Sequence, residues 1–174
     1  MTNGSLIHGK TNLPLYGKNG TLLYGSPVSM HVDITISWSG GQDVDICGHY
    51  NVVSGEVGWS WCENGATIEQ DGFSMTWDGD NTSGGPEYVH LSYSGGRSLA
   101  DVKFYVHANW FRVNGEEEQG DGGTCTVTAT DSKGTSKSYT FTPAQSHGSK
   151  ATTGNPGVCL NFNHDGTLKS ITAG

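Results

Sequence analysis

Apolar and polar residues alternate along most of the chain, which is the pattern of β-strands with one buried face. In residues 30–38 the apolar phase runs from Met30 to Trp38, while His31 and Asp33 belong to the polar phase. The same period recurs in residues 44–46, 57–61, 73–77, 89–93, 102–108, 125–129, 139–141, 158–162 and 168–171. We expect a short strand at each of these segments.

Short strands separated by glycine-rich turns, without a helical period, predict an all-β fold. We expect an antiparallel β-sandwich, jelly-roll-like, over residues 30–174. The length of 174 residues fits one domain with an appended arm better than two domains. Residues 114–123, with Glu116, Glu117 and Glu118 among them, are expected to form a long exposed loop.

Residues 1–29 have a different pattern. Leu15-Tyr16-Gly17 recurs as Leu23-Tyr24-Gly25, and Asn19-Gly20 between them is a strong signal for a tight hairpin turn. Two short strands cannot hold a core of their own. We therefore expect an N-terminal β-hairpin arm that docks on the main domain or on another subunit, with residues 6–27 making contacts between subunits.

Charge and hydropathy exclude several classes of partner. The formal net charge is −8 and no dense basic cluster occurs, which argues against nucleic acid. No apolar stretch approaches the roughly 20 residues of a membrane span. The first nine residues lack the basic and apolar regions of a secretion signal, so we expect synthesis in a cytoplasm and no membrane partner.

Four cysteines stand singly, without a Cys-x-x-Cys pair, which argues against a structural zinc site. They are Cys47, Cys62, Cys125 and Cys159. Without a signal peptide we expect reduced and mostly buried thiols. The alternative is a hairpin of residues 46–50 and 57–63 that places Cys47 opposite Cys62, within reach of a disulfide in an oxidising setting.

Two acidic segments, 43–45 and 78–87, lie where alternating runs break off. Their candidate oxygen ligands are Asp43, Asp45, Asp80, Asn81 and Glu87, with Asp78 as a spare. Calcium takes about six to eight oxygens from such groups, and an all-protein oxygen cage suits it better than magnesium. We expect a Ca²⁺ site that stabilises the fold. The alternative is that Asp and Asn stand here because they favour turns.

The order of these motifs resembles two bacterial β-sandwich families over residues 32–111. An Asp-x-Asp step followed by Gly79-Asp80-Asn81 is similar to the loops of the TerD tellurite-resistance family, whose members bind calcium. Ile36-Ser37-Trp38 and Gly85-Pro86-Glu87 are closer to the YfaP-like domain. Carried over by position, the resemblance implies Asp43, Asp45, Asp80, Asn81 and Glu87 as calcium ligands. The arm and the tail after Gly120 match neither pattern, which weakens a stress-protein role.

No motif of a nucleophilic hydrolase, a zinc protease or a phosphate-binding loop occurs, so we expect a protein that is not an enzyme. Its seven histidines are scattered along the sequence. Three of them, His49, His90 and His107, lie in predicted strands, where packing and hydrogen bonding are their usual roles. A cluster of these three across a sheet is the alternative.

The overall character of the chain resembles a bacteriophage virion protein, such as a head-decoration or tail-associated subunit made in the host cytoplasm. That resemblance implies a structural or surface-binding subunit of an oligomer or lattice. One alternative is a TerD-like stress protein of the bacterial cytoplasm.

Another alternative is a lectin-like module that binds a surface glycan on an aromatic platform. Its candidate aromatics are Trp59, Trp61, Trp77, Trp110, Tyr50, Tyr88, Tyr93 and Tyr105. We expect Trp38, Trp59, Trp61 and Trp77 to be interior, because they follow the apolar phase.

Overall fold

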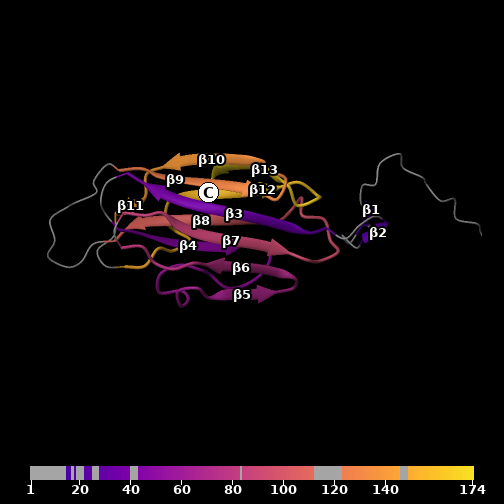
Figure 1. Ribbon diagram of the computed structural model, residues 1–174, viewed down its shortest axis with the longest axis horizontal. Coiled ribbons are helices and arrows are strands. Elements are labelled where there is room, and N and C mark those ends of the chain that lie inside the picture. The colour runs from indigo at the N-terminus through magenta and orange to yellow at the C-terminus, as the bar shows by residue number, and fades with distance from the viewer. Residues whose placement is uncertain are drawn as a thin grey trace, which may run out of the picture.

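The computed structural model describes residues 15–16, 18, 22–24, 28–39, 43–82, 84–111, 123–145 and 149–174. These residues form strands and turns, and none of them belongs to a helix that could cross a membrane. The strands are β1 (Leu15–Tyr16), β2 (Leu22–Tyr24), β3 (Met30–Trp38), β4 (Val44–Tyr50), β5 (Thr67–Gln70), β6 (Phe73–Trp77), β7 (Glu87–Tyr93), β8 (Lys103–Trp110), β9 (Cys125–Asp131), β10 (Ser136–Phe141), β11 (Ala144–Gln145), β12 (Gly157–Phe162) and β13 (Leu168–Ala173). Two larger sheets pack face to face (Figure 1), which confirms the predicted β-sandwich.

The six-stranded sheet has the order β10-β9-β3-β7-β6-β5, with β3 near its middle. Ile34 of β3 lies opposite Val89 of β7 and Ala129 of β9, and all three side chains are buried. A register that pairs apolar residues with apolar residues puts them all on one face. One face of this sheet is therefore a wall of the core, and the other carries the polar phase.

The five-stranded sheet is built around β8. This strand pairs with β4 along one edge and with β12 along the other, and β13 lies beyond β12. The short β11 runs beside the end of β8 and makes the one parallel pairing among the described strands. Phe104 and Trp110 face the core, whereas Tyr105, His107 and Asn109 lie on the outer face of the sheet.

The core fills the space between the two sheets. Its largest fully buried aromatic side chains are Trp77, Trp110, Phe73, Phe104 and Phe162. They come from β6, β8 and β12, that is, from strands of both sheets. Trp77 and Trp110 belong to the predicted lectin platform, and so do the buried Tyr50 and Tyr93.

The strand predicted at residues 57–61 is wrong. Val57 makes a single isolated bridge with Gly48, and the chain then turns away from β4. Gly58 has φ +129°, and a side chain there would collide with the carbonyl oxygen of Ile46. The alternation of Val57, Trp59 and Trp61 belongs to a loop, and the two tryptophans are only partly buried.

Because this hairpin does not form, Cys47 and Cys62 are not paired through it. All four cysteines are free thiols, with Cys47, Cys125 and Cys159 buried and Cys62 partly buried. This agrees with the prediction of reduced, mostly buried thiols.

The predicted N-terminal hairpin is confirmed to the extent that β1 and β2 pair antiparallel, with Leu15 opposite Tyr24. Apart from residues 18, 28 and 29, the rest of the predicted arm lies outside the described residues, as does nearly all of the exposed loop predicted at residues 114–123. The surface on which the arm docks stays a prediction.

Candidate metal centre

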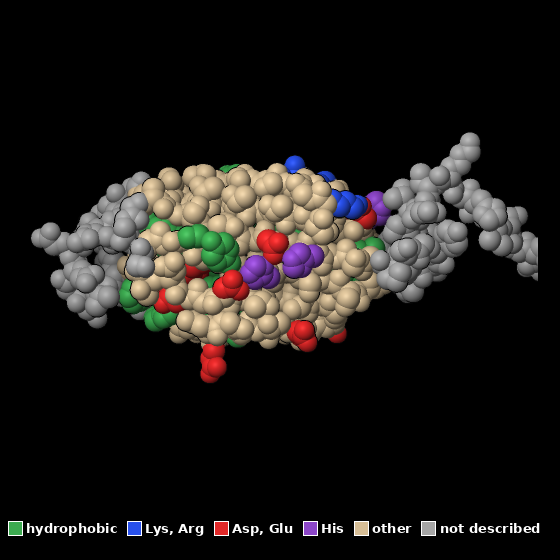
Figure 2. Space-filling view, in the orientation of Figure 1, with side chains coloured by type: hydrophobic (Ala, Val, Ile, Leu, Met, Phe, Trp, Pro, Cys, Tyr) green, Lys and Arg blue, Asp and Glu red, His purple; other side chains and the backbone are tan. Residues whose placement is uncertain are grey.

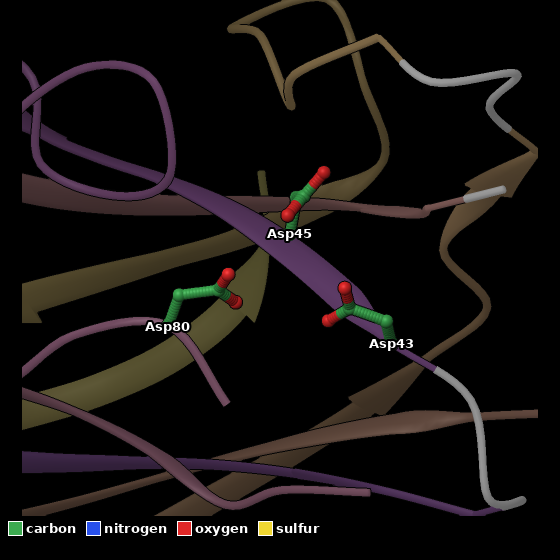
Figure 3. A group of neighbouring side chains, drawn as sticks. All are labelled: Asp43, Asp45 and Asp80. Atoms are coloured by element: carbon green, nitrogen blue, oxygen red, sulfur yellow. The ribbon is translucent and has the colours of Figure 1, made fainter. Parts of the chain in front are cut away.

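Three of the predicted ligands come together at one end of the sandwich. Each of Asp43, Asp45 and Asp80 offers a carboxylate oxygen, and these oxygens lie within 4.8 Å of one another. Figure 3 shows Asp43 and Asp45 at the start of β4 and Asp80 on the loop between β6 and β7, with their carboxylates directed toward a common space. The cluster thus joins residues that are far apart in the sequence.

Asp45 of β4 and Asp43, just before the strand, share a face because side chains in extended chain alternate with a period of two. Val44 and Ile46, in the other phase, are fully buried in the core. Asp45 is on the outer phase, yet it is only 1 % exposed. A carboxylate shielded to this degree needs a partner of opposite charge or a proton.

The loop that brings Asp80 is held by packing on both sides. Gly79 has φ +125°, and a Cβ there would lie 2.9 Å from Cγ of Asn64. The Asp80 backbone N–H donates to the Asn64 side-chain oxygen at 3.5 Å. A Cβ on Gly85 would lie 2.9 Å from the Trp38 ring. Glycines at these two positions let the loop approach its neighbours closely and fix the carboxylate of Asp80.

The electrostatics of the cluster are those of carboxylates without a counter-charge. Burial, and then the charges of Asp43 and Asp80, raise the pKa of Asp45 to about 8. Burial and the charge of Asp80 raise the pKa of Asp43 to about 6, and burial also raises the pKa of Asp80. Each of the three aspartates has one buried oxygen without a hydrogen-bond partner among the described residues.

Glu87 and Asn81, the other two predicted ligands, lie beside the cluster and hold its loop in place. Oε2 of Glu87 accepts from the Trp77 indole N–H at 3.0 Å, and Oε1 accepts from the Asn81 backbone N–H at 3.4 Å. The Asn81 amide donates to the Pro86 carbonyl oxygen at 3.3 Å. Burial raises the pKa of Glu87 to about 8, and the charges of Asp80 and Asp45 act in the same direction.

Two further polar residues, Asp78 and Asn109, lie at the same end of the sandwich as the three aspartates. Asp78, the spare candidate, is half-exposed and accepts from the His90 ring at 3.2 Å, on the outside of the six-stranded sheet. Asn109 was not among the ligands predicted from the sequence. It is opposite Asp45 in the β4–β8 register, its amide donates to Ser149, and its buried Oδ1 has no partner among the described residues. Only the strand register reveals it.

The donor set fits a hard divalent cation. All three clustered side chains offer carboxylate oxygens, which calcium and magnesium prefer, and no nitrogen or sulfur atom belongs to the cluster. A cation there would satisfy the unpartnered oxygens and offset the mutual repulsion that, after burial, raises the pKa values of Asp43 and Asp45.

Stabilisation of the protein by calcium should grow as the pH rises from about 5 to about 8. Without metal, the folded carboxyls of Asp43 and Asp45 have pKa values of about 6 and about 8, above the ordinary 3.8. The folded state then binds more protons than the unfolded state, so the free energy of unfolding of the metal-free centre falls as pH rises through those values. Calcium binds the ionised carboxylates, so it offsets this fall in the free energy of unfolding at high pH.

Urea denaturation in EDTA and in calcium, at about pH 5 and about pH 8, measures the effect. Taking the difference between the two series removes the contributions of groups remote from the centre, such as His107, whose pKa is lowered by burial. A calcium effect that is equal at both pH values, or larger at the lower one, contradicts the assignment.

Comparison of the chain with models of protein families, with curated proteins and with solved structures found no match. The resemblance to the TerD and YfaP-like families therefore stays a prediction.

Proposed function

We propose that the chain is a calcium-stabilised, non-enzymatic β-sandwich that serves as a structural or surface-binding subunit of an assembly. The observation that carries the calcium assignment is the group of three aspartates, each with a buried oxygen that lacks a hydrogen-bond partner among the described residues. Direct binding of calcium to the metal-free protein tests it.

The role of the ion follows from the elements that it would connect. Asp45 belongs to β4 of the five-stranded sheet and Asp43 immediately precedes that strand, whereas Asp80 belongs to the loop between two strands of the six-stranded sheet. A cation held by all three ties one sheet to the other at this end of the sandwich. Its contribution is to stability and to the relative position of the two sheets.

A broad polar face supports the surface-binding part of the proposal. On the outer side of the six-stranded sheet, three successive hydroxyl pairs join β9 to β10, at 2.8, 2.8 and 3.1 Å. Beside them, Asp33 contacts His90 at 2.7 Å and His31 at 3.2 Å. Figure 2 shows histidine and acidic side chains gathered in the middle of this face. Such a face offers hydrogen bonds to a partner over a wide area.

A bacteriophage virion is the assembly that we propose, with the N-terminal hairpin as the contact between subunits. Among the described strands, β1 and β2 pair only with each other and extend neither larger sheet. A two-stranded hairpin has little stability alone and gains it by packing on another surface. The neighbouring subunit is the surface that this proposal assigns to it.

Deletion of residues 1–27 should leave a folded monomer and abolish self-association of the full chain. Among the residues whose burial the structure describes, the core begins at Val28 and Met30, so the deletion removes none of the residues that the structure places in the core. Light scattering after size exclusion measures the mass, and circular dichroism measures the fold. Loss of the fold on deletion would place the arm in the core, and an oligomer of unchanged size would remove the arm from the interface.

The lectin alternative has less support. Four of its eight candidate aromatics, Trp77, Trp110, Tyr50 and Tyr93, are buried in the core and cannot contact a glycan. Trp59 packs against Phe111 with ring centroids 5.2 Å apart, and Lys150 covers the Trp61 ring at 3.2 Å. Tyr88, 41 % exposed, is the one exposed large hydrophobic residue in the described part of the chain.

A further inference from the structure

Two histidines meet on the outer face of the five-stranded sheet. In the β4–β8 register His49 lies opposite Tyr105, and His107 lies opposite Cys47, so the two histidines are diagonal neighbours on the same face. Their Nε2 atoms are 3.4 Å apart. The ring centroids are 5.4 Å apart and the ring planes differ by 9°, so the two nitrogens lie between the rings and face each other.

The other ring nitrogen of each histidine contacts a backbone carbonyl. Nδ1 of His107 is 2.8 Å from the Asn155 oxygen, and Nδ1 of His49 is 3.2 Å from the Tyr50 oxygen. A carbonyl oxygen only accepts hydrogen bonds, so both Nδ1 atoms carry a proton. In a neutral imidazole the second nitrogen then has a lone pair and no proton.

The facing Nε2 atoms are therefore two lone pairs directed at one another. While both Nδ1 contacts are kept, this arrangement is unfavourable unless a cation lies between the two Nε2 atoms, and the cation is either a proton or a metal ion. The neutral alternative is an Nε2–H···Nε2 hydrogen bond, which costs one ring its hydrogen bond to a backbone carbonyl. A proton would leave an imidazolium at a site where burial and the neighbouring His49 lower the pKa of His107. A metal ion accepts both lone pairs without charging either ring.

We propose that His49 and His107 form a site for a divalent transition ion of the kind that prefers imidazole, with Zn²⁺ as the reference ion. Zinc binds histidine nitrogens at about 2.0–2.1 Å, and a tetrahedral angle then separates two of them by about 3.3–3.4 Å. The observed distance of 3.4 Å matches that separation. The Nδ1 contacts with carbonyl oxygens are those that commonly orient metal-bound histidines.

The surroundings fit this assignment. Tyr105 stacks on His49 with centroids 5.1 Å apart and holds the ring in place, and His49 is partly exposed, which gives an ion access. Among the described residues no third histidine, cysteine or carboxylate completes a close group here, so solvent would supply the remaining ligands. The site is separate from the three aspartates in its residues, and its nitrogen donors do not suit calcium.

Titration of Zn²⁺ against a chromophoric chelator tests the proposal, with the full chain kept saturated in calcium so that the aspartates stay occupied. We expect one zinc ion per chain, bound about a hundredfold more weakly after His49→Gln or His107→Gln, because a single imidazole loses the advantage of chelation. The control His31→Gln changes a histidine on the outer face of the other sheet and should leave zinc binding unchanged. Calcium binding by the His49→Gln variant should be unchanged, which separates this site from the calcium proposal.

Nitrogen-15 NMR of the wild-type side chains gives a second readout that does not depend on a variant. The metal-free spectrum should show both rings protonated at Nδ1 only, and zinc should shift the two Nε2 signals together. Zinc affinity that survives His49→Gln overturns the proposal. So does a proton on either Nε2 at neutral pH in the absence of metal.

Discussion

Calcium at a hundred times its dissociation constant should raise the midpoint of thermal unfolding by about 5–10 °C over the value in EDTA. A ligand that binds only the folded state at this excess contributes about 2.7 kcal/mol, and each kcal/mol shifts the midpoint of a domain this size by about 2–4 °C. The folded state alone brings Asp80 to the aspartates of β4, so the unfolded chain has no equivalent site.

Scanning calorimetry or circular dichroism at neutral pH measures this shift. Magnesium at the same concentration is the matched comparison, and we expect a smaller effect because it accommodates an irregular protein cage less well. Equal midpoints in EDTA and in calcium would contradict calcium binding to the folded protein. A larger shift with magnesium would replace calcium by the smaller ion.

Asp45→Asn should have opposite effects on the two forms of the protein. In EDTA the variant should unfold at a higher temperature than the wild type, because it removes a buried carboxyl whose pKa burial and two neighbouring aspartates raise to about 8. The expected gain is on the order of a few kcal/mol, since one unit of pKa shift corresponds to about 1.4 kcal/mol. Calcium should no longer stabilise the variant, because one of the three ligand carboxylates is gone.

Asp101→Asn is the matched control, since Asp101 is exposed and lies outside the cluster. It should change neither the midpoint in EDTA nor the response to calcium. If Asp45→Asn lowers the midpoint in EDTA and still responds to calcium, Asp45 is a structural hydrogen-bonding residue and not a metal ligand.

The alternation of apolar residues was sufficient to predict most of the sandwich. The run in residues 30–38 became β3 with the same ends, because an uninterrupted period of two leaves one consistent buried face. Residues 57–61 show the same alternation without forming a strand. There Gly58, which packs against the Ile46 carbonyl, turns the chain away from β4. A period alone does not say whether a neighbouring strand accepts the pairing.

The sequence predicted which residues lie at the candidate metal site, and only partly which of them point their oxygens toward a common space. Asp43 and Asp45 share a face because of their spacing, which the sequence displays directly. That Asp80 reaches them, whereas Glu87 bonds to Trp77 and Asn81, depends on how the two sheets pack. Asn109 depends on the register of β4 with β8.

The histidine pair illustrates the same limit. His49 and His107 are separated by 58 positions, and each alone reads as a half-buried polar residue of a strand. Their proximity follows from the β4–β8 register, and a shift of the register by one residue would place them on opposite faces. The sequence predicts that both histidines lie in strands. It does not predict that their Nε2 atoms lie close together.

Isothermal titration of calcium into the protein after removal of metal by EDTA tests the central claim most directly. At neutral pH we predict one calcium ion per chain, with protons released on binding because the carboxyls of Asp45 and Glu87 have pKa values of about 8 in the metal-free protein. Titration in two buffers of different ionisation enthalpy measures that release, and Asp45→Asn should abolish the binding. A titration without heat in either buffer, at concentrations where the wild-type protein is folded, would contradict the claim that the three aspartates bind calcium and stabilise this sandwich.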